Sequence, residues 1–161
     1  MRQPITALMR TPAEVHDLAL SWGRADLPFF AAGACHVLAF AFLERYPQAG
    51  FRPRFIRPAP GFRGAHVYVT DGQLAFDAQG FVPEAELLRL HMLALRSMQP
   101  GWQGEVQEIG VPLAEFCAGQ QHRPPWAYPG DVWARAQRYL NLFPDPATVA
   151  GDAQTPPDQL A

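Results

Sequence analysis

The sequence predicts an α+β fold in which a central buried helix packs on a small antiparallel sheet, with other helices on its flanks. Two observations lead to this class. Helical patterns come first, a cluster of short extended segments follows, and helical patterns then return, which differs from the alternation of βαβ units. Within the cluster, Asp71-Gly72 separates two short apolar runs, and this dipeptide is a strong signal for a hairpin.

Length and composition indicate one domain with a sizeable core. The chain has 161 residues, of which 48% are hydrophobic and 17% charged. We expect a single domain over residues 1–143 and a flexible tail, rich in Pro and Asp, over 144–161. The net charge of −2 argues against nucleic acid as a partner. Two cysteines are too few for a zinc ribbon, and we expect neither a metal nor a cofactor.

The sequence shows no targeting or membrane signal. Residues 1–17 lack the apolar run of a signal peptide. Residues 27–43 carry no Asp, Glu, Arg or Lys, but they include Pro28 and Gly33 and indicate a buried helix more than a membrane span. We therefore expect no membrane association, and either a cytoplasmic protein or a secreted effector without a classical signal peptide.

Two helices are predicted before the extended segments. Thr11 and Glu14 form a capping box, which starts a helix that runs to Gly23. The inward positions of this helix are Val15, Leu18, Ala19 and Trp22. A loop over 24–33 leads to a second helix over 34–46, which is apolar almost all round and is therefore expected at the centre of the fold.

Strands and further helices follow. Residues 51–57 are extended, and Pro53 indicates an edge strand. After a loop over 58–64, residues 65–70 and 73–77 form the hairpin, and Gly80 ends the unit. The later elements are a helix over 83–98, a strand over 105–109, a helix over 112–118 and a helix over 131–142 capped by Asp131.

The hairpin places a histidine beside an aspartate. If Asp71-Gly72 is the loop, His66 lies directly opposite Asp77, with Cβ atoms about 4.5–5.5 Å apart. Because side chains alternate along a strand, one face carries His66, Tyr68, Ala75 and Asp77, and the other carries Val67, Val69, Leu74 and Phe76. A carboxylate in that position can hold an imidazole in one orientation and tautomer.

Cys35 lies in the first turn of the predicted buried helix. The free N–H groups and the dipole of a helix N-terminus favour a thiolate and can stabilise an oxyanion. Cys35, His66 and Asp77 are thus candidates for a nucleophile, a base and its orienter. His36 and Tyr68 are candidates for lining this site. The structural alternatives are a small buried hydrophobe for Cys35 and a cross-strand pair for His66 and Asp77.

The chain order Cys35, His66, Asp77 resembles that of the papain-like cysteine enzymes in the broad sense. These include papain-type proteases, bacterial cell-wall peptidases, arylamine N-acetyltransferases and, closest in its Cys-His-Asp set, the transglutaminase-like branch. The resemblance covers residues 33–80. It implies a papain-like fold and a peptidase, amidase, deamidase or acyl transferase that acts on an amide bond of a protein or peptide. No Gln lies between Gln3 and Cys35, so the second oxyanion donor is unassigned.

Arginines are concentrated around the predicted first strand, at positions 45, 52, 54, 57 and 63. Arg52 and Arg54 are candidates for weak substrate binding. The alternative is a charged strand that resists aggregation. Two other functions stay open: a non-catalytic adaptor or effector-associated binding domain that keeps the fold, and a nucleic-acid-associated protein that uses the arginine-rich strand.

Overall fold

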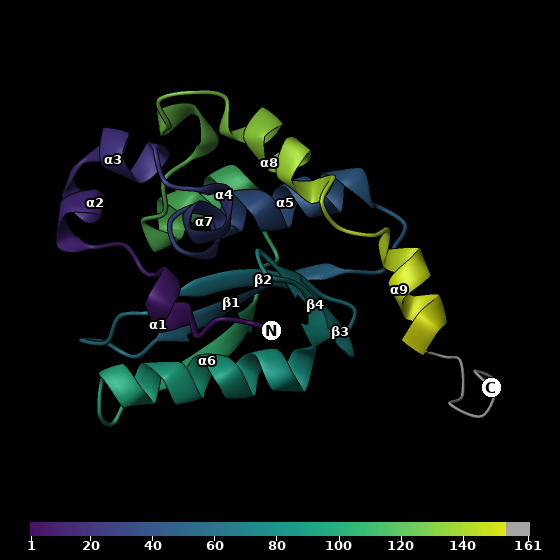
Figure 1. The fold of residues 1–161 in the computed structure, drawn as a ribbon, viewed down its shortest axis with the longest axis horizontal. Helices are drawn as coiled ribbons and strands as arrows, with labels where there is room; N and C mark the ends of the chain where they lie inside the picture. Colours follow the sequence, from purple (N-terminus) through teal and green to yellow (C-terminus); the bar gives the residue numbers. More distant parts are fainter. Residues whose placement is uncertain (154–161) are drawn as a thin grey trace.

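The computed structural model describes residues 1–153, and these form an antiparallel sheet with helices on both faces (Figure 1). In this part of the chain the strand order is β4-β3-β2-β1-β5. The strands are β1 (Arg52–Pro58), β2 (His66–Thr70), β3 (Leu74–Asp77), β4 (Gly80–Pro83) and β5 (Gly104–Glu108). The predicted α+β class is confirmed.

The helices divide between the two faces of the sheet. They are α1 (Ile5–Leu8), α2 (Pro12–His16), α3 (Leu18–Trp22), α4 (Asp26–Ala31), α5 (Cys35–Arg45), α6 (Glu84–Met98), α7 (Leu113–Gln120), α8 (Val132–Leu140) and α9 (Pro146–Ala153). Figure 1 shows α5 and α8 on one side of the sheet and α6 on the other.

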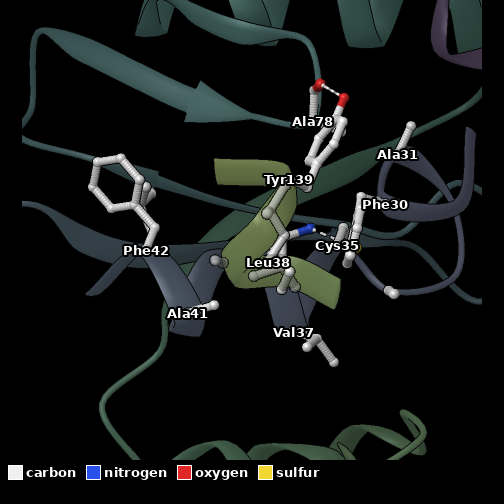
Figure 2. Packing of buried hydrophobic residues seen from close by; sticks show 14 of the residues in the cluster. Phe30, Ala31, Cys35, Val37, Leu38, Ala41, Phe42, Ala78 and Tyr139 are labelled. Atoms are coloured by element: carbon white, nitrogen blue, oxygen red, sulfur yellow. Dashed lines mark hydrogen bonds between the residues drawn. The ribbon is translucent and has the colours of Figure 1, made fainter. Parts of the chain in front are cut away.

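Each face of the sheet has its own apolar core. Phe55, Val67, Val69 and Phe76 belong to the cluster that includes α5. Ile56, Tyr68, Ala75 and Val82 belong to the cluster that includes Leu87 and Leu95 of α6. Helix α5 is covered by β2 on one side and by α8 on the other, which explains why it is apolar almost all round (Figure 2). The prediction of a central buried helix is confirmed.

The first predicted helix is two helices. The capping box of Thr11 and Glu14 is present. The chain breaks at Asp17, whose Oδ1 accepts the N–H groups of Ala19 and Leu20 and so starts α3. Because of this break Val15 and Ala19 are exposed, and their expected inward position was wrong. Helix α4 occupies much of the predicted loop over 24–33.

Strand β1 is not an edge strand. It pairs with β2 on one side and with β5 on the other. Pro53 is tolerated because it lies just beyond the last pair of the β1–β5 ladder, Arg54 with Glu108, so its missing N–H leaves the regular part of that ladder intact. Its carbonyl still accepts the N–H of Ile109 at 3.1 Å.

Two chain segments differ from expectation after the hairpin. Gly80 begins β4, so it continues the sheet instead of ending it. Helix α9 lies within the segment expected to be a flexible tail. The flexibility of that segment stays a prediction, and residues 154–161 lie outside the described residues.

The hairpin register differs by two residues from the predicted one. Val69 pairs with Phe76 and Thr70 with Ala75. The loop is Gly72-Gln73, with φ of 98° at Gly72, as the first central position of a type II′ turn requires. Asp71 Oδ1 accepts the N–H groups of Gln73 and Leu74, both at 2.8 Å, and fixes this turn.

A shift of two residues leaves every side chain on its predicted face, because the side-chain period of a strand is two. Tyr68 and Ala75 face α6, and Val67 and Val69 face α5, as expected. The prediction that His66 lies directly opposite Asp77 was wrong, since the observed register places Asp77 diagonally to His66.

Candidate functional site

Cys35 lies where β2 and β3 separate. The β2–β3 ladder ends at Val69 and Phe76. If it continued, the next pair to exchange backbone hydrogen bonds would be Val67 and Ala78. Instead, the N–H of Val67 donates to Cys35 Sγ at 3.4 Å, and the carbonyl of Ala78 accepts the hydroxyl of Tyr139 from α8 (Figure 2). The start of α5 and α8 thus occupy the gap in the sheet, and a backbone N–H points at the thiol.

His66 and Asp77 are hydrogen-bonded. Nε2 of His66 lies 3.1 Å from Oδ2 of Asp77, and both side chains are buried. Nδ1 of His66 is also buried and has no hydrogen-bond partner among the described residues. Asp77 therefore holds one ring nitrogen and leaves the other available for proton exchange. The predicted contact within hydrogen-bond reach is present, although its register is diagonal.

Arg2 is a second partner of Asp77 that sequence analysis missed. One of its guanidinium nitrogens lies 2.7 Å from both carboxylate oxygens. The N–H of Gln79 donates to Oδ1 of Asp77 at 2.9 Å. The carboxylate is thus fixed from three sides. Arg2 has no local pattern that could have indicated this contact, because 75 positions separate it from Asp77.

The electrostatics favour a thiolate and an imidazolium. Burial raises the pKa of Cys35, but the imidazoles of His36 and His66 lower it more, to well below its usual range. Burial lowers the pKa of His66, but Asp77 and Cys35 raise it to about 10. Burial raises the pKa of Asp77, and His66 and Arg2 outweigh this and bring it to about 2. These shifts favour the charged form of each of the three groups.

His36 lies at the site as expected. Its Nε2–H donates to the carbonyl of Arg123 at 2.7 Å. The rings of His36 and His122 are nearly perpendicular, and their centroids are 5.0 Å apart. Burial lowers the pKa of His36, but Cys117 and Cys35 raise it to about 9. The ring therefore adds a second positive charge near the thiol.

The other candidate site residues lie elsewhere. The hydroxyl of Tyr68 donates to Glu84 at 2.8 Å on the α6 face. Arg54 pairs with Glu84 at 2.9 Å and with Glu108 at 3.0 Å, and Arg52 is exposed at the start of β1. None of the three lines the cleft onto which Cys35 opens.

Cys35 and His36 open onto a cleft of about 680 Å³. Arg10, Arg63, His122 and Arg123 also line it. Of these, Arg10, His122 and Arg123 were not predicted as site residues. They come from the segment before α2 and from the loop after α7, so only the packing of distant segments brings them together.

His91 of α6 supports the far side of His66. The two rings stack with centroids 5.5 Å apart, and Nε2–H of His91 donates to the carbonyl of Gly64 at 2.9 Å. Burial and the charge of His66 lower the pKa of His91 to about 3. His91 is thus a neutral, buried residue that adds no competing charge.

Gly33 shapes the entry to α5 and gives a first prediction. Its φ is 138°, and its carbonyl accepts the hydroxyl of Tyr128 at 2.8 Å. We expect Gly33→Ala to lower the free energy of unfolding by about 1–3 kcal/mol, because an L side chain rarely adopts this conformation. Urea unfolding measures this, with Gly119→Ala in open space as the control. Equal stability of the two variants would contradict the requirement for glycine.

Comparison of the chain with family models, curated proteins and solved structures finds no match. Among residues 1–153, no helix is long and apolar enough to cross a membrane. Within the same range, no three His, Cys, Asp or Glu side chains are grouped so that they could hold a metal ion. The fold and the site thus define an α+β protein with a buried Cys-His-Asp arrangement beside a cleft.

Proposed function

We propose that this protein is a cysteine-dependent hydrolase or acyl transferase that acts on an amide bond through Cys35, His66 and Asp77. One observation carries the proposal: the thiol borders a cleft, receives a backbone N–H and interacts with the imidazole of His66, which a buried carboxylate holds. The resemblance to papain-like enzymes, and a protein or peptide substrate, belong to the same proposal.

The proposed reaction starts with attack of the Cys35 thiolate on the substrate carbonyl carbon. A C–S bond forms, and negative charge moves to the carbonyl oxygen. The N–H groups in the first turn of α5 can donate hydrogen bonds to that oxygen and stabilise its charge, since the N-cap residue Ala34 supplies no capping side chain. As the C–N bond breaks, the His66 imidazolium gives its proton to the leaving amine, and an acyl-enzyme remains.

The second half of the reaction releases the acyl group. Water or another nucleophile loses a proton to His66 and attacks the thioester, and the C–S bond breaks to restore the thiolate. Asp77 stabilises the imidazolium in both halves. Peptidase, amidase, deamidase and acyl-transfer activities share this intermediate and differ in the leaving group or in the nucleophile that resolves it. A cytoplasmic enzyme and a secreted effector are both compatible with this chemistry.

The test compares the two thiols, which are both free and buried. We expect iodoacetamide at pH 6 to modify Cys35 in the native protein, with a rate that changes little between pH 6 and pH 8. An ordinary thiol with a pKa of about 8.5 gains about tenfold per pH unit in this range. Cys117 should stay unmodified until the protein unfolds. Intact mass and peptide mapping separate the two sites.

The unfolded protein at alkaline pH is the control, because both thiols should react there at similar rates. If Cys35 is unreactive at pH 6 in the native state, or if Cys117 reacts first, the enzyme proposal fails. The adaptor alternative would then apply, and a partner should bind Cys35→Ala unchanged.

A further inference from the structure

The cleft beside Cys35 is strongly cationic. Three arginines line it, Arg10, Arg63 and Arg123, together with His36 and His122. No Asp or Glu is among the described residues that line it. This composition differs from that of the whole chain, whose net charge is −2. The positive charge is therefore concentrated at the site.

The three arginine side chains have no carboxylate partner within residues 1–153. None of them forms an ion pair or donates a side-chain hydrogen bond there. Elsewhere in the same range arginines pair with carboxylates, namely Arg2, Arg24, Arg54, Arg89 and Arg135. Arg10 and Arg123 are half-buried, and Arg63 is exposed. A half-buried arginine without a counterion is costly, since it loses part of its hydration without compensation.

Two of these side chains are held beside the loop that leads to Cys35. A Cβ built on Gly33 would lie 3.5 Å from Cδ of Arg10, so the stem of Arg10 runs along this glycine. The guanidinium of Arg123 stacks on Tyr128 at 5.4 Å, and the Tyr128 hydroxyl donates to the carbonyl of Gly33. Burial and the charge of Arg123 both lower the pKa of Arg10, which shows how closely the charges are gathered.

We propose that Arg10, Arg63 and Arg123 bind a carboxylate or phosphate group of the acyl substrate, close to the carbonyl that Cys35 attacks. This inference rests on the proposed function, whose substrate class it narrows to anionic acyl compounds. The fork of a guanidinium matches the paired oxygens of both groups. The bound anion would supply the counterion that the described part of the chain does not provide.

The first experiment compares anionic iodoacetate with neutral iodoacetamide at Cys35. Both reagents attack the same thiolate, so the ratio of their rate constants cancels any change in the thiol pKa. We expect this ratio to be about tenfold higher for native Cys35 than for the unfolded chain, because the arginines attract the anion. It should fall by most of that factor in Arg10→Gln and Arg123→Gln, and in high salt.

Arg138→Gln is the matched control, since Arg138 is exposed on α8 and does not line the cleft. Its ratio should equal that of the wild type. A Cys35 that reacts with both reagents without preferring iodoacetate, or whose preference survives in both cleft variants, would overturn the anion site and leave the proposed function standing.

The second experiment is independent of thiol chemistry. Cys35→Ala is titrated with glutarate and, separately, with inorganic phosphate, and the arginine Nε–H signals are followed by NMR. Saturable shifts that disappear when Arg10→Gln is added support the site, and the anion that binds identifies a carboxylate or a phosphate substrate. No saturable shift with either anion overturns the site. Anion binding with an unreactive Cys35 refutes the proposed function alone.

Discussion

Replacing His66 with alanine is expected to slow the alkylation of Cys35 at pH 6 by about 100-fold or more. Burial is the largest influence on the pKa of Cys35 and raises it, whereas His36 and His66 lower it. The substitution removes the effect of His66 and leaves the effect of burial in place. A thiol with a pKa of about 8.5 is less than 1% ionised at pH 6. The rate in the variant should then rise about tenfold per pH unit, whereas the wild-type rate stays nearly flat. Iodoacetamide kinetics from pH 5 to pH 9 measure both profiles.

Two further variants make this result specific. His66→Gln fills more of the buried space and replaces the alanine variant if circular dichroism shows that His66→Ala is unfolded. His16→Ala removes an exposed histidine and should leave the profile unchanged. If the rate at pH 6 stays within about twofold of the wild type without His66, then His36 and the start of α5 stabilise the thiolate, and the role assigned to His66 is wrong.

Asp77→Asn is expected to cost about 3–5 kcal/mol of the free energy of unfolding at neutral pH, because it leaves a buried imidazolium and Arg2 without their carboxylate. The folded pKa of Asp77, about 2, is lowered from its ordinary value. Its contribution is therefore present above the unfolded pKa of about 3.9 and is lost as the pH falls through 2. Denaturant unfolding from pH 7 to pH 2 should show the two proteins converging at the acid end.

Arg2→Gln separates the contribution of Asp77 to stability from its effect on His66. This variant removes the ion pair between Arg2 and Asp77 but keeps the hydrogen bond between Asp77 and His66. We expect it to lose stability while the alkylation profile of Cys35 moves little. Asp77→Asn should also lower the pKa of His66, so that the alkaline limit of the thiolate–imidazolium state falls below about 10. Identical profiles for the two variants would refute the positioning role of Asp77.

Local chemistry accounts for the features that were predicted correctly. The capping box at Thr11, the cap at Asp131 and the apolar helix that starts at Cys35 depend on residues within a few positions of one another. The face that each side chain of β2 and β3 occupies follows from strand periodicity alone. For this reason His66 and Asp77 could be placed on one face even though their register was predicted incorrectly.

The register shows the limit of a local signal. Two different two-residue loops can share Gly72, and a type II′ loop needs a positive φ at only one position, whereas a type I′ loop needs it at both. The Asp71 carboxylate, which binds the N–H groups of Gln73 and Leu74, stabilises the observed turn. In the same way Pro53, which suggested an edge strand, is compatible with an inner one because of where the β5 ladder ends.

The sequence by itself determined the α+β class, the central helix with a cysteine in its first turn, and the face shared by His66 and Asp77, because local hydrogen bonding and side-chain period specify them. Only the tertiary structure decided what surrounds these groups. Helices α5 and α8 enter the gap between β2 and β3, Arg2 reaches Asp77, and Arg10 and Arg123 line the same cleft. These contacts join residues far apart in the chain, and they form because burying two apolar cores brings those segments together.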